Sequence, residues 1–191
     1  MKIEKGQPGY LRVQKTRYLM WAVVEFAVVA AVFILGYVQT GKKENLFTVV
    51  AIVGCLPAAK MLVEFITMYP HQGIEPSKYR EIEQKAPLVT RVYDLLITST
   101  GKGMPVEAFV IYGRVLCGYT RSPKTDDAAL AGAIKKTLLD QRYDKMTVKI
   151  FHDYSMFLAR AEGLNNIAAV ERQESDRNEQ NIKRILTGIS M

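Results

Sequence analysis

The feature that most constrains this chain is an uninterrupted apolar run near its start, "YLMWAVVEFAVVAAVFILGYV" from Tyr18 to Val38. A helix needs about 20 apolar residues to cross the hydrocarbon core of a bilayer. This run has that length, and Glu25 is its only charged residue. The basic leader before it is too long for a secretory signal, and no small-x-small cleavage site follows it. We therefore predict a retained transmembrane helix over residues 18–38.

A second apolar run, Leu46 to Tyr69, is also long enough to cross, but it contains Pro57, Lys60 and Glu64. Only residues 46–59 are free of charge, and an apolar run of that length is also typical of a re-entrant segment or a buried helix. We predict a second span over residues 46–69, which makes residues 18–69 a transmembrane hairpin.

Basic residues near the two runs predict how the hairpin is oriented. Five of them precede the first run, and only Lys42 and Lys43 lie in the short connecting loop. The positive-inside rule then places both termini in the cytoplasm, in a bacterial-type inner (plasma) membrane. We expect the five to bind anionic lipid headgroups, at about 1 kcal/mol each. They are Lys2, Lys5, Arg12, Lys15 and Arg17.

The net charge of +7 does not predict a nucleic-acid partner, because more than half of it belongs to the basic tether of residues 1–17. Residues 70–191 hold 18 basic and 15 acidic residues, which is too balanced for a phosphate-backbone footprint. Cys55 lies in the second apolar run and Cys117 in a predicted strand, so neither indicates a disulfide or a metal site.

Three charges fall within the apolar runs, and we expect them to interact. At 1.5 Å per residue, Glu25 lies about 10 Å deep, Lys60 roughly 13 Å and Glu64 roughly 7 Å. Each would cost on the order of 3 kcal/mol facing lipid. We predict that Glu25 pairs with Lys60 across the hairpin or between subunits. Such a cluster is either a polar clamp that fixes helix pairing or part of an ion pathway in a small transport subunit.

After a linker at residues 70–76, the pattern predicts an α/β (α+β) domain over residues 77–152. The predicted elements are a helix from Pro76-Ser77 to Pro87, then three strands, of which the first two are joined by a turn at "GKGMP". A helix from about Asp126 and a fourth strand complete the domain. Two amphipathic helices follow as a C-terminal extension, residues 153–191. The three strands are expected at residues 88–100, 106–112 and 115–120, and the fourth at residues 145–151.

The hairpin "PVEAFVIYGRVLCGYTRS", residues 105–122, carries one glutamate, Glu107, before a Tyr-Gly-Arg corner. The order of elements over residues 76–152 resembles the core of the PD-(D/E)XK nuclease-like fold, and the hairpin is similar to the nuclease-related domain family, NERD. That family has Glu-x-Asp before a glycine corner and Glu-x-Lys at the end of the next strand. Glu107 matches the first acid, whereas Phe109, Gly118 and Thr120 stand at the other three positions.

The resemblance implies a metal-dependent nuclease scaffold that lacks most of its ligands. Such enzymes need converging carboxylates to hold Mg²⁺ and a lysine near the reacting water. Glu107, with Asp94 on the neighbouring strand, makes a poor magnesium site. The other interpretation of Glu107 is a salt bridge, for which Arg114 and Arg91 are the expected partners.

The remaining signals predict neither a metal nor a cofactor. His71 and His152 have no His or Cys at metal-ligand spacing. His152-Asp153 at a strand-to-helix junction mimics a catalytic dyad, but a helix cap by Asp153 is the simpler interpretation. The sequence thus favours a non-catalytic interaction or regulatory domain on a membrane anchor, which associates with itself or with a membrane protein partner. A membrane-tethered nuclease using Glu107 and Asp94 is the alternative from another class.

Overall fold

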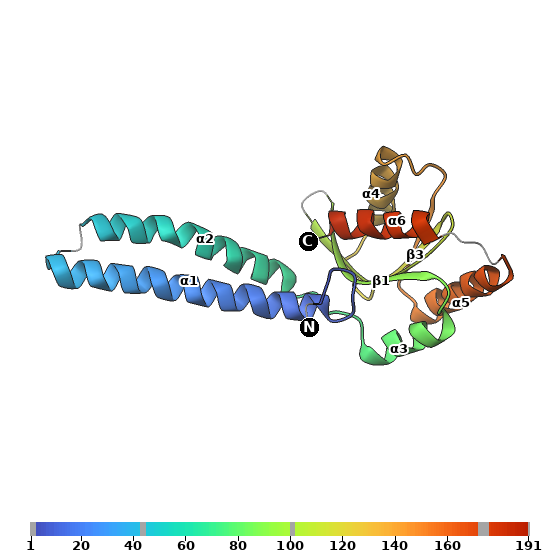
Figure 1. Cartoon of the computed structure of the whole chain (residues 1–191), viewed down its shortest axis with the longest axis horizontal. Coiled ribbons are helices and arrows are strands. Elements are labelled where there is room, and N and C mark those ends of the chain that lie inside the picture. The colour runs from blue at the N-terminus through green and yellow to red at the C-terminus, as the bar shows by residue number, and fades with distance from the viewer. Residues whose placement is uncertain (1–2, 43–44, 100–101, 172–175, 191) are drawn as a thin grey trace. The chain divides into compact units, whose positions relative to one another are not determined.

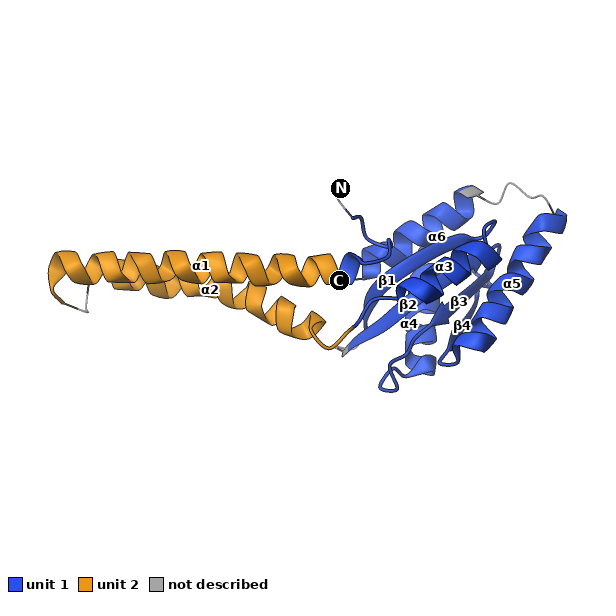
Figure 2. Ribbon diagram, turned by 90° about the horizontal axis from the view of Figure 1, so that it is seen from below, with its two compact units in different colours: residues 1–11, 72–191 blue, residues 12–71 orange. Residues whose placement is uncertain are grey.

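The computed structural model describes residues 3–42, 45–99, 102–171 and 176–190, which form two compact units. One unit is residues 12–71, and the other combines residues 1–11 with residues 72–191 (Figure 2). The first residues of the chain therefore belong to the same unit as its C-terminal part.

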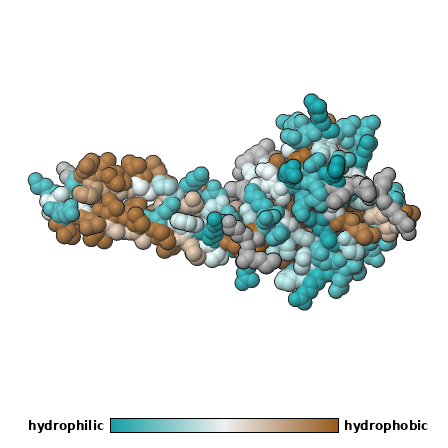
Figure 3. All heavy atoms as spheres, viewed as in Figure 1, coloured by the Kyte–Doolittle hydropathy of each residue, from teal (hydrophilic) through white to brown (hydrophobic). Residues whose placement is uncertain are grey.

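The first unit is a pair of helices, α1 (Tyr10–Thr40) and α2 (Leu46–Met68). Asn45 caps α2 by accepting a hydrogen bond from the Thr48 N–H at 2.9 Å. Pro57 lies inside α2 without ending it, so the second apolar run is one continuous helix. Both helices are long and apolar enough to cross a membrane. Their apolar side chains cover the outside of the pair, as Figure 3 shows.

Small residues and one lysine hold the two helices of this pair together. A Cβ on Gly54 would lie 3.1 Å from Val29 Cγ2, which is tighter than most Cβ contacts, so this glycine lets the two helices approach closely. Gly36 makes a similar close approach to Phe47. Lys15 Nζ donates to the carbonyls of Tyr69, at 3.0 Å, and His71, which places a positive charge at the C-terminal end of α2.

The second unit is a four-stranded sheet with helices on both faces, which confirms the predicted α/β class (Figure 1). Strands β1, β2 and β3 form an antiparallel meander, and β4 pairs parallel to β3 after the crossover helix α4. The elements are α3 (Pro76–Lys85), β1 (Thr90–Ser99), β2 (Lys102–Tyr112), β3 (Val115–Tyr119), α4 (Asp127–Asp140), β4 (Thr147–Phe151), α5 (Tyr154–Glu171) and α6 (Asp176–Ile189).

Two hydrophobic cores lie on the two faces of this sheet. Helices α3 and α5 cover one face, where Phe157 and Leu164 of α5 are buried. Helices α4 and α6 cover the other, with Leu130 and Ile134 from α4 and Leu186 from α6. The last two helices, expected as an extension, thus supply core residues to the same compact unit as the sheet.

The predicted turn at "GKGMP" is wrong in its bounds, because β2 already begins at Lys102. Pro105 lies within this strand and pairs with Leu96 of β1. A proline is acceptable there because β3 pairs only with residues 108–112 of β2, so the other side of Pro105 is a local edge. Residues 100 and 101 of the turn lie outside the described part of the chain.

Candidate functional site

Glu107 lies in the middle of β2 and is buried, with 5% of its surface exposed. Its Oε1 accepts a hydrogen bond from Arg121 Nε at 2.8 Å. The predicted salt bridge therefore exists, but its partner is Arg121, just beyond β3, and neither Arg114 nor Arg91. Burial raises the pKa of Glu107, and the Arg121 guanidinium opposes that rise. The second carboxylate oxygen, Oε2, has no hydrogen-bond partner among the described residues.

Asp94 lies in β1 and is buried still more deeply, at 1% exposure. Its backbone is in the left-handed region, with φ of 54°. Its two carboxylate oxygens accept hydrogen bonds from the Gly9 N–H and the Ile74 N–H, each at 2.6 Å. Asp94 thus holds two segments against β1, one on each side of the helical hairpin in the sequence.

The strand reverses its faces at Asp94. Tyr93 packs under α3 and α5, whereas Leu95 packs on the opposite face, under α4 and α6. Residues two apart on a strand normally share a face. On β2, Ala108 and Val106 show the same reversal on either side of Glu107. The positive φ of Asp94 produces this switch, and Asp is among the residues that tolerate it.

The two acids that the sequence singled out lie at the same level of the sheet, with the linker residue Gly73 between their hydrogen-bond networks. Arg121, which pairs with Glu107, also contacts the Gly73 carbonyl through Nη2 at 3.4 Å. A Cβ on Gly73 would lie 2.6 Å from an Asp94 carboxylate oxygen. Segment 73–74 therefore occupies the space beside both carboxylates.

The three positions where the family resemblance expects other ligands are tightly enclosed. Phe109 and Thr120 are fully buried. A Cβ on Gly118 would lie 2.7 Å from the Phe109 ring and 2.9 Å from Ile150, so an acidic side chain does not fit there without a shift of the core. Within the described ranges, no three His, Cys, Asp or Glu side chains gather as metal ligands.

A lysine and two tyrosines form a cluster near Glu107 that the sequence did not reveal. Lys78 Nζ, from α3, donates to the Tyr119 hydroxyl at 2.9 Å and lies about 5 Å from the ring centres of Tyr119 and Tyr154. The Tyr154 hydroxyl donates to Glu81 at 3.0 Å. Burial and this carboxylate raise the pKa of Tyr154. These contacts join α3 to the sheet and α5.

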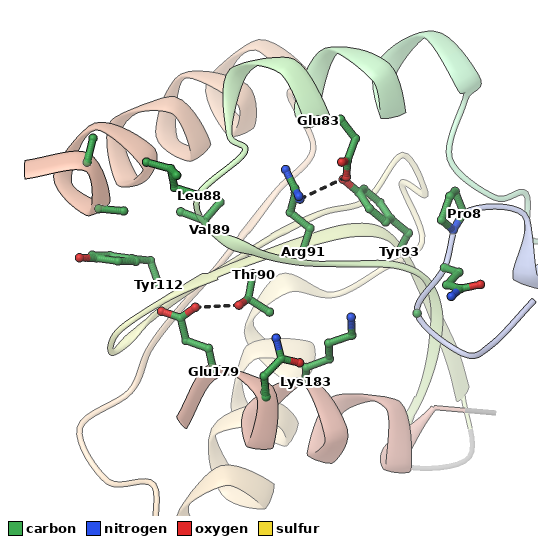
Figure 4. A pocket seen from close by; sticks show the side chains of 15 residues that line it. Pro8, Glu83, Leu88, Val89, Thr90, Arg91, Tyr93, Tyr112, Glu179 and Lys183 are labelled. Atoms are coloured by element: carbon green, nitrogen blue, oxygen red, sulfur yellow. Dashed lines mark hydrogen bonds and ion pairs between the residues drawn. The ribbon is translucent and has the colours of Figure 1, made fainter. Parts of the chain in front are cut away.

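A groove with a volume of about 600 Å³ opens along β1 (Figure 4). Because β1 is an edge strand, its outer side depends on other segments for cover. Gly6 supplies part of it, since its carbonyl accepts a hydrogen bond from the Tyr93 N–H at 2.9 Å. Thr90 and Arg91 line the groove beside residues of α3, α5 and α6.

Charges of both signs are fixed in this groove. Glu179 of α6 is buried, and it accepts hydrogen bonds from Thr90 Oγ1 at 2.7 Å and from the Gly113 N–H at 3.0 Å. Arg91 Nε lies 3.1 Å from Glu83 of α3. Lys183 of α6, a half-buried residue, also lines the groove. The groove therefore offers fixed carboxylates and cations side by side.

Two tyrosines of the groove also donate to carboxylates. The Tyr93 hydroxyl donates to Glu83 at 2.9 Å, and burial together with that bond raises its pKa. The Tyr112 hydroxyl donates to Glu171 at 2.7 Å, and this hydrogen bond raises the pKa of Tyr112 to about 12. Both phenols are thus held in the protonated, donating form. Sequence reasoning missed this groove because its lining comes from segments far apart in the chain.

The charges of the helical hairpin lie differently from the prediction. The buried residues Ala51 and Ala58 mark one side of α2. Lys60 follows Ala51 by nine residues, which is about two and a half helical turns, so it lies on the opposite side of the helix. Lys60 is exposed, and no ion pair among the described residues joins it to Glu25 or Glu64. The described residues therefore show no ion pair between Glu25 and Lys60 within one hairpin, and pairing between subunits stays a prediction.

Two of the five basic residues predicted to bind headgroups contact the chain itself. Lys5 Nζ donates to the Ser190 carbonyl at 2.9 Å, and Lys15 binds the carbonyls at the end of α2. Arg12 and Arg17 are exposed on α1, and Lys2 lies outside the described residues.

The predicted cap at Asp153 is confirmed, and Asp126 caps the helix that was expected to start near it. The Asp126 carboxylate accepts from the N–H groups of Ala128 and Ala129, and Asp153 accepts from the Met156 N–H at 3.1 Å. His152 Nε2 lies 2.8 Å from Asp127, so the residue beside the histidine in space is not its neighbour in sequence. Asp153 therefore caps α5, as the simpler interpretation predicted.

Comparisons with protein-family models, curated proteins and solved structures found no match to this chain.

Proposed function

We propose that this chain is an integral membrane protein whose two helices anchor a cytoplasmic α/β domain in a bacterial-type inner membrane. The domain works by binding, as an interaction or regulatory module of an oligomer or a larger membrane complex. Two apolar helices with mostly exposed side chains support the anchor. The excess of Lys and Arg outside the connecting loop supports cytoplasmic termini.

The binding role is supported by the interactions of the two candidate catalytic acids, Asp94 and Glu107. Both carboxylate oxygens of Asp94 accept hydrogen bonds from backbone N–H groups, and Glu107 pairs with Arg121. A carboxylate that already holds the chain in place is not free to ligate a metal or to move a proton to a substrate. These acids support a structural joint around Gly73.

The groove along β1 is the proposed binding site. A ligand there would meet the Glu83 carboxylate beside cations from Arg91 and Lys183, so we expect a polar partner that carries both charges, such as a peptide segment. Its hydrogen bonds would compete with water in an open groove, which is typical of a regulatory contact.

A site-specific photo-crosslinker tests this site in the intact protein in its own membrane. We place it at Gln180, which lines the groove, and at exposed Lys145 as the matched control. We expect a discrete adduct from position 180 that a Lys183→Glu substitution reduces, and none from position 145. Equal labelling from both positions would contradict the proposed groove.

The orientation is tested by labelling a single cysteine. Lys43→Cys in a background without Cys55 and Cys117 should react with a membrane-impermeant maleimide added outside the cell. Labelling only after the inner face is opened would reverse the proposed topology.

A nuclease is the second candidate, and one observation favours it. Glu107 is buried with an unpartnered Oε2 and a raised pKa, in an element order that resembles the PD-(D/E)XK core. The full chain in detergent should leave DNA intact in Mg²⁺ and in Mn²⁺. Metal-dependent cleavage that disappears in Glu107→Gln would overturn the binding role.

A further inference from the structure

The outer edge of β1 is covered by extended segments of this chain at two points. The Tyr93 N–H donates to the Gly6 carbonyl at 2.9 Å, and Ile97 forms an antiparallel bridge with Ser190. Lys5 Nζ donates to the Ser190 carbonyl at 2.9 Å, which ties the two covering segments to each other. The α/β unit therefore closes parts of this edge with main-chain contacts of its own.

The same edge is open at Arg91. Along a strand, the N–H and C=O groups of successive residues point to alternate sides, so those of Arg91 point to the same side as the Tyr93 N–H, away from β2. Arg91 accordingly faces Val110 of β2 as a pair without ladder hydrogen bonds. Among the described residues, neither backbone group of Arg91 has a hydrogen-bond partner. One donor and one acceptor are thus presented where Arg91 lines the groove.

Two helices form walls on either side of this open edge, as Figure 4 shows. Glu83 of α3 lies on one side, 3.1 Å from Arg91 Nε, and Lys183 of α6 lines the other. In a strand added beside β1, the residue opposite Arg91 would share its face, toward α3, and the next residue would turn toward α6. The groove thus sorts the side chains of an extended segment into two rows.

The α6 wall favours an acidic side chain. Lys183 is a half-buried residue of this wall, and no salt bridge among the described residues neutralises it. Glu179, one turn earlier on α6, is buried and already accepts hydrogen bonds from Thr90 and from the Gly113 N–H. Leu88, which is 59% exposed, adds an apolar contact just before β1. A carboxylate in the row that faces α6 would therefore meet Lys183.

We propose that the partner binds as an added β-strand, in which an extended peptide segment pairs its main chain with Arg91 on the outer edge of β1 and directs an acidic side chain at Lys183. The inference deepens the proposed binding role of the groove and rests on it. A strand is the occupant that fits, because an extended main chain supplies an acceptor and a donor at strand spacing. Gly6 already supplies such an acceptor beside Tyr93.

N-methylated peptides test the strand pairing, with the full chain in detergent. A library of short linear peptides that each carry one aspartate is screened, and fluorescence anisotropy gives the affinity of the tightest binder. Alternate N–H groups of a strand face the same neighbour, so there are two sets of nitrogens to methylate. Methylation of one set should weaken binding about tenfold, and methylation of the other should change it little. Equal losses from both sets, or a library without a binder, overturn strand addition.

Substitutions in the full chain test the edge and the α6 wall. Arg91→Ala removes the guanidinium but keeps the outward N–H, whereas Arg91→Pro removes both, and an edge strand tolerates a proline there. We expect Arg91→Pro to bind the selected peptide about tenfold more weakly than Arg91→Ala, and Lys183→Glu to weaken binding by a similar factor. Near-ultraviolet circular dichroism checks that each variant is folded, and if Arg91→Pro is not, the N-methylated peptides decide. Equal affinities of the two folded Arg91 variants overturn pairing at this residue. An affinity that Lys183→Glu leaves unchanged places the peptide elsewhere.

The photo-crosslinker at Gln180 separates failure of the added strand from failure of the groove. An adduct in the native membrane that Lys183→Glu reduces, together with no alternation among the N-methylated peptides, keeps the groove as a binding site and overturns only the strand. The absence of both an adduct and a peptide binder contradicts the proposed function itself.

Discussion

The charged residues of the two units are used in opposite ways. In the α/β unit, the buried acids Asp94, Glu107 and Glu179 each have donors from segments distant in sequence. In the helical pair, Lys60 and Glu64 have no ion partner within the described chain. The α/β unit thus uses these buried acids to hold its own segments together, although Glu107 Oε2 lacks a partner among the described residues. The charged residues of α2 show no such internal use in the described part of the hairpin.

The largest effect should come from Asp94→Ala, which removes the carboxylate that binds two separate segments of the α/β unit. It leaves the N–H groups of Gly9 and Ile74 without their acceptors, at about 1–3 kcal/mol each. It also places an alanine at positive φ. We expect a loss of roughly 3 kcal/mol in the free energy of unfolding of the full chain in detergent, followed by near-ultraviolet circular dichroism. Asp94→Asn, which tolerates the backbone and keeps one acceptor, should lose less. Equal free energies of unfolding for Asp94→Ala and the wild type would contradict a structural role of Asp94 in holding these segments.

Glu107→Gln should change how stability depends on pH. The folded protein raises the pKa of Glu107 above its usual 4.5, so it binds this proton more tightly than the unfolded chain does. Its contribution is therefore complete below pH 4.5 and is lost as the pH rises through the folded pKa. We therefore expect the free energy of unfolding of Glu107→Gln, measured in urea, to increase relative to that of the wild type as the pH rises through the folded pKa. Exposed Glu162→Gln serves as the control and should run parallel to the wild type.

A smaller change is expected from Tyr112→Phe in the groove. The bond to Glu171 raises the pKa of Tyr112 to about 12, so this phenol contributes stability that is present below pH 10 and is lost as the pH approaches 12. The phenylalanine variant should lack that alkaline loss. Unfolding curves between pH 9 and about 12 measure it, with Tyr143→Phe as the control. An unchanged alkaline slope would show that the bond to Glu171 does not hold the proton.

The smallest effect on folding should come from Lys60→Met. Since no ion pair joins Lys60 to another described residue, we expect the free energy of unfolding of the α/β unit to change by less than about 0.5 kcal/mol. The level of oligomer in the membrane should fall nevertheless. A normal oligomer level together with a lost ion flux would instead favour the transport role for Glu25, Lys60 and Glu64.

Local signals in the sequence predicted local structure well. Hydrophobic periodicity predicted the positions of the helices and strands, and Asp126 and Asp153 indicated where α4 and α5 begin. These predictions succeed because a cap or an amphipathic face depends on residues within a few positions of one another. The second apolar run, predicted as one span despite Pro57, is one helix, because the rest of α2 continues through that proline.

What the sequence determined by itself is therefore an apolar helical pair joined to an α/β domain with one conspicuous acid, Glu107. Only the tertiary structure decided that Arg121 pairs with it, that Asp94 holds Gly9 and Ile74, and that Lys60 points away from α1. The physical reason is that these facts depend on which surfaces pack against each other. Such packing joins residues that are far apart in the chain, and no periodicity along the sequence reports it.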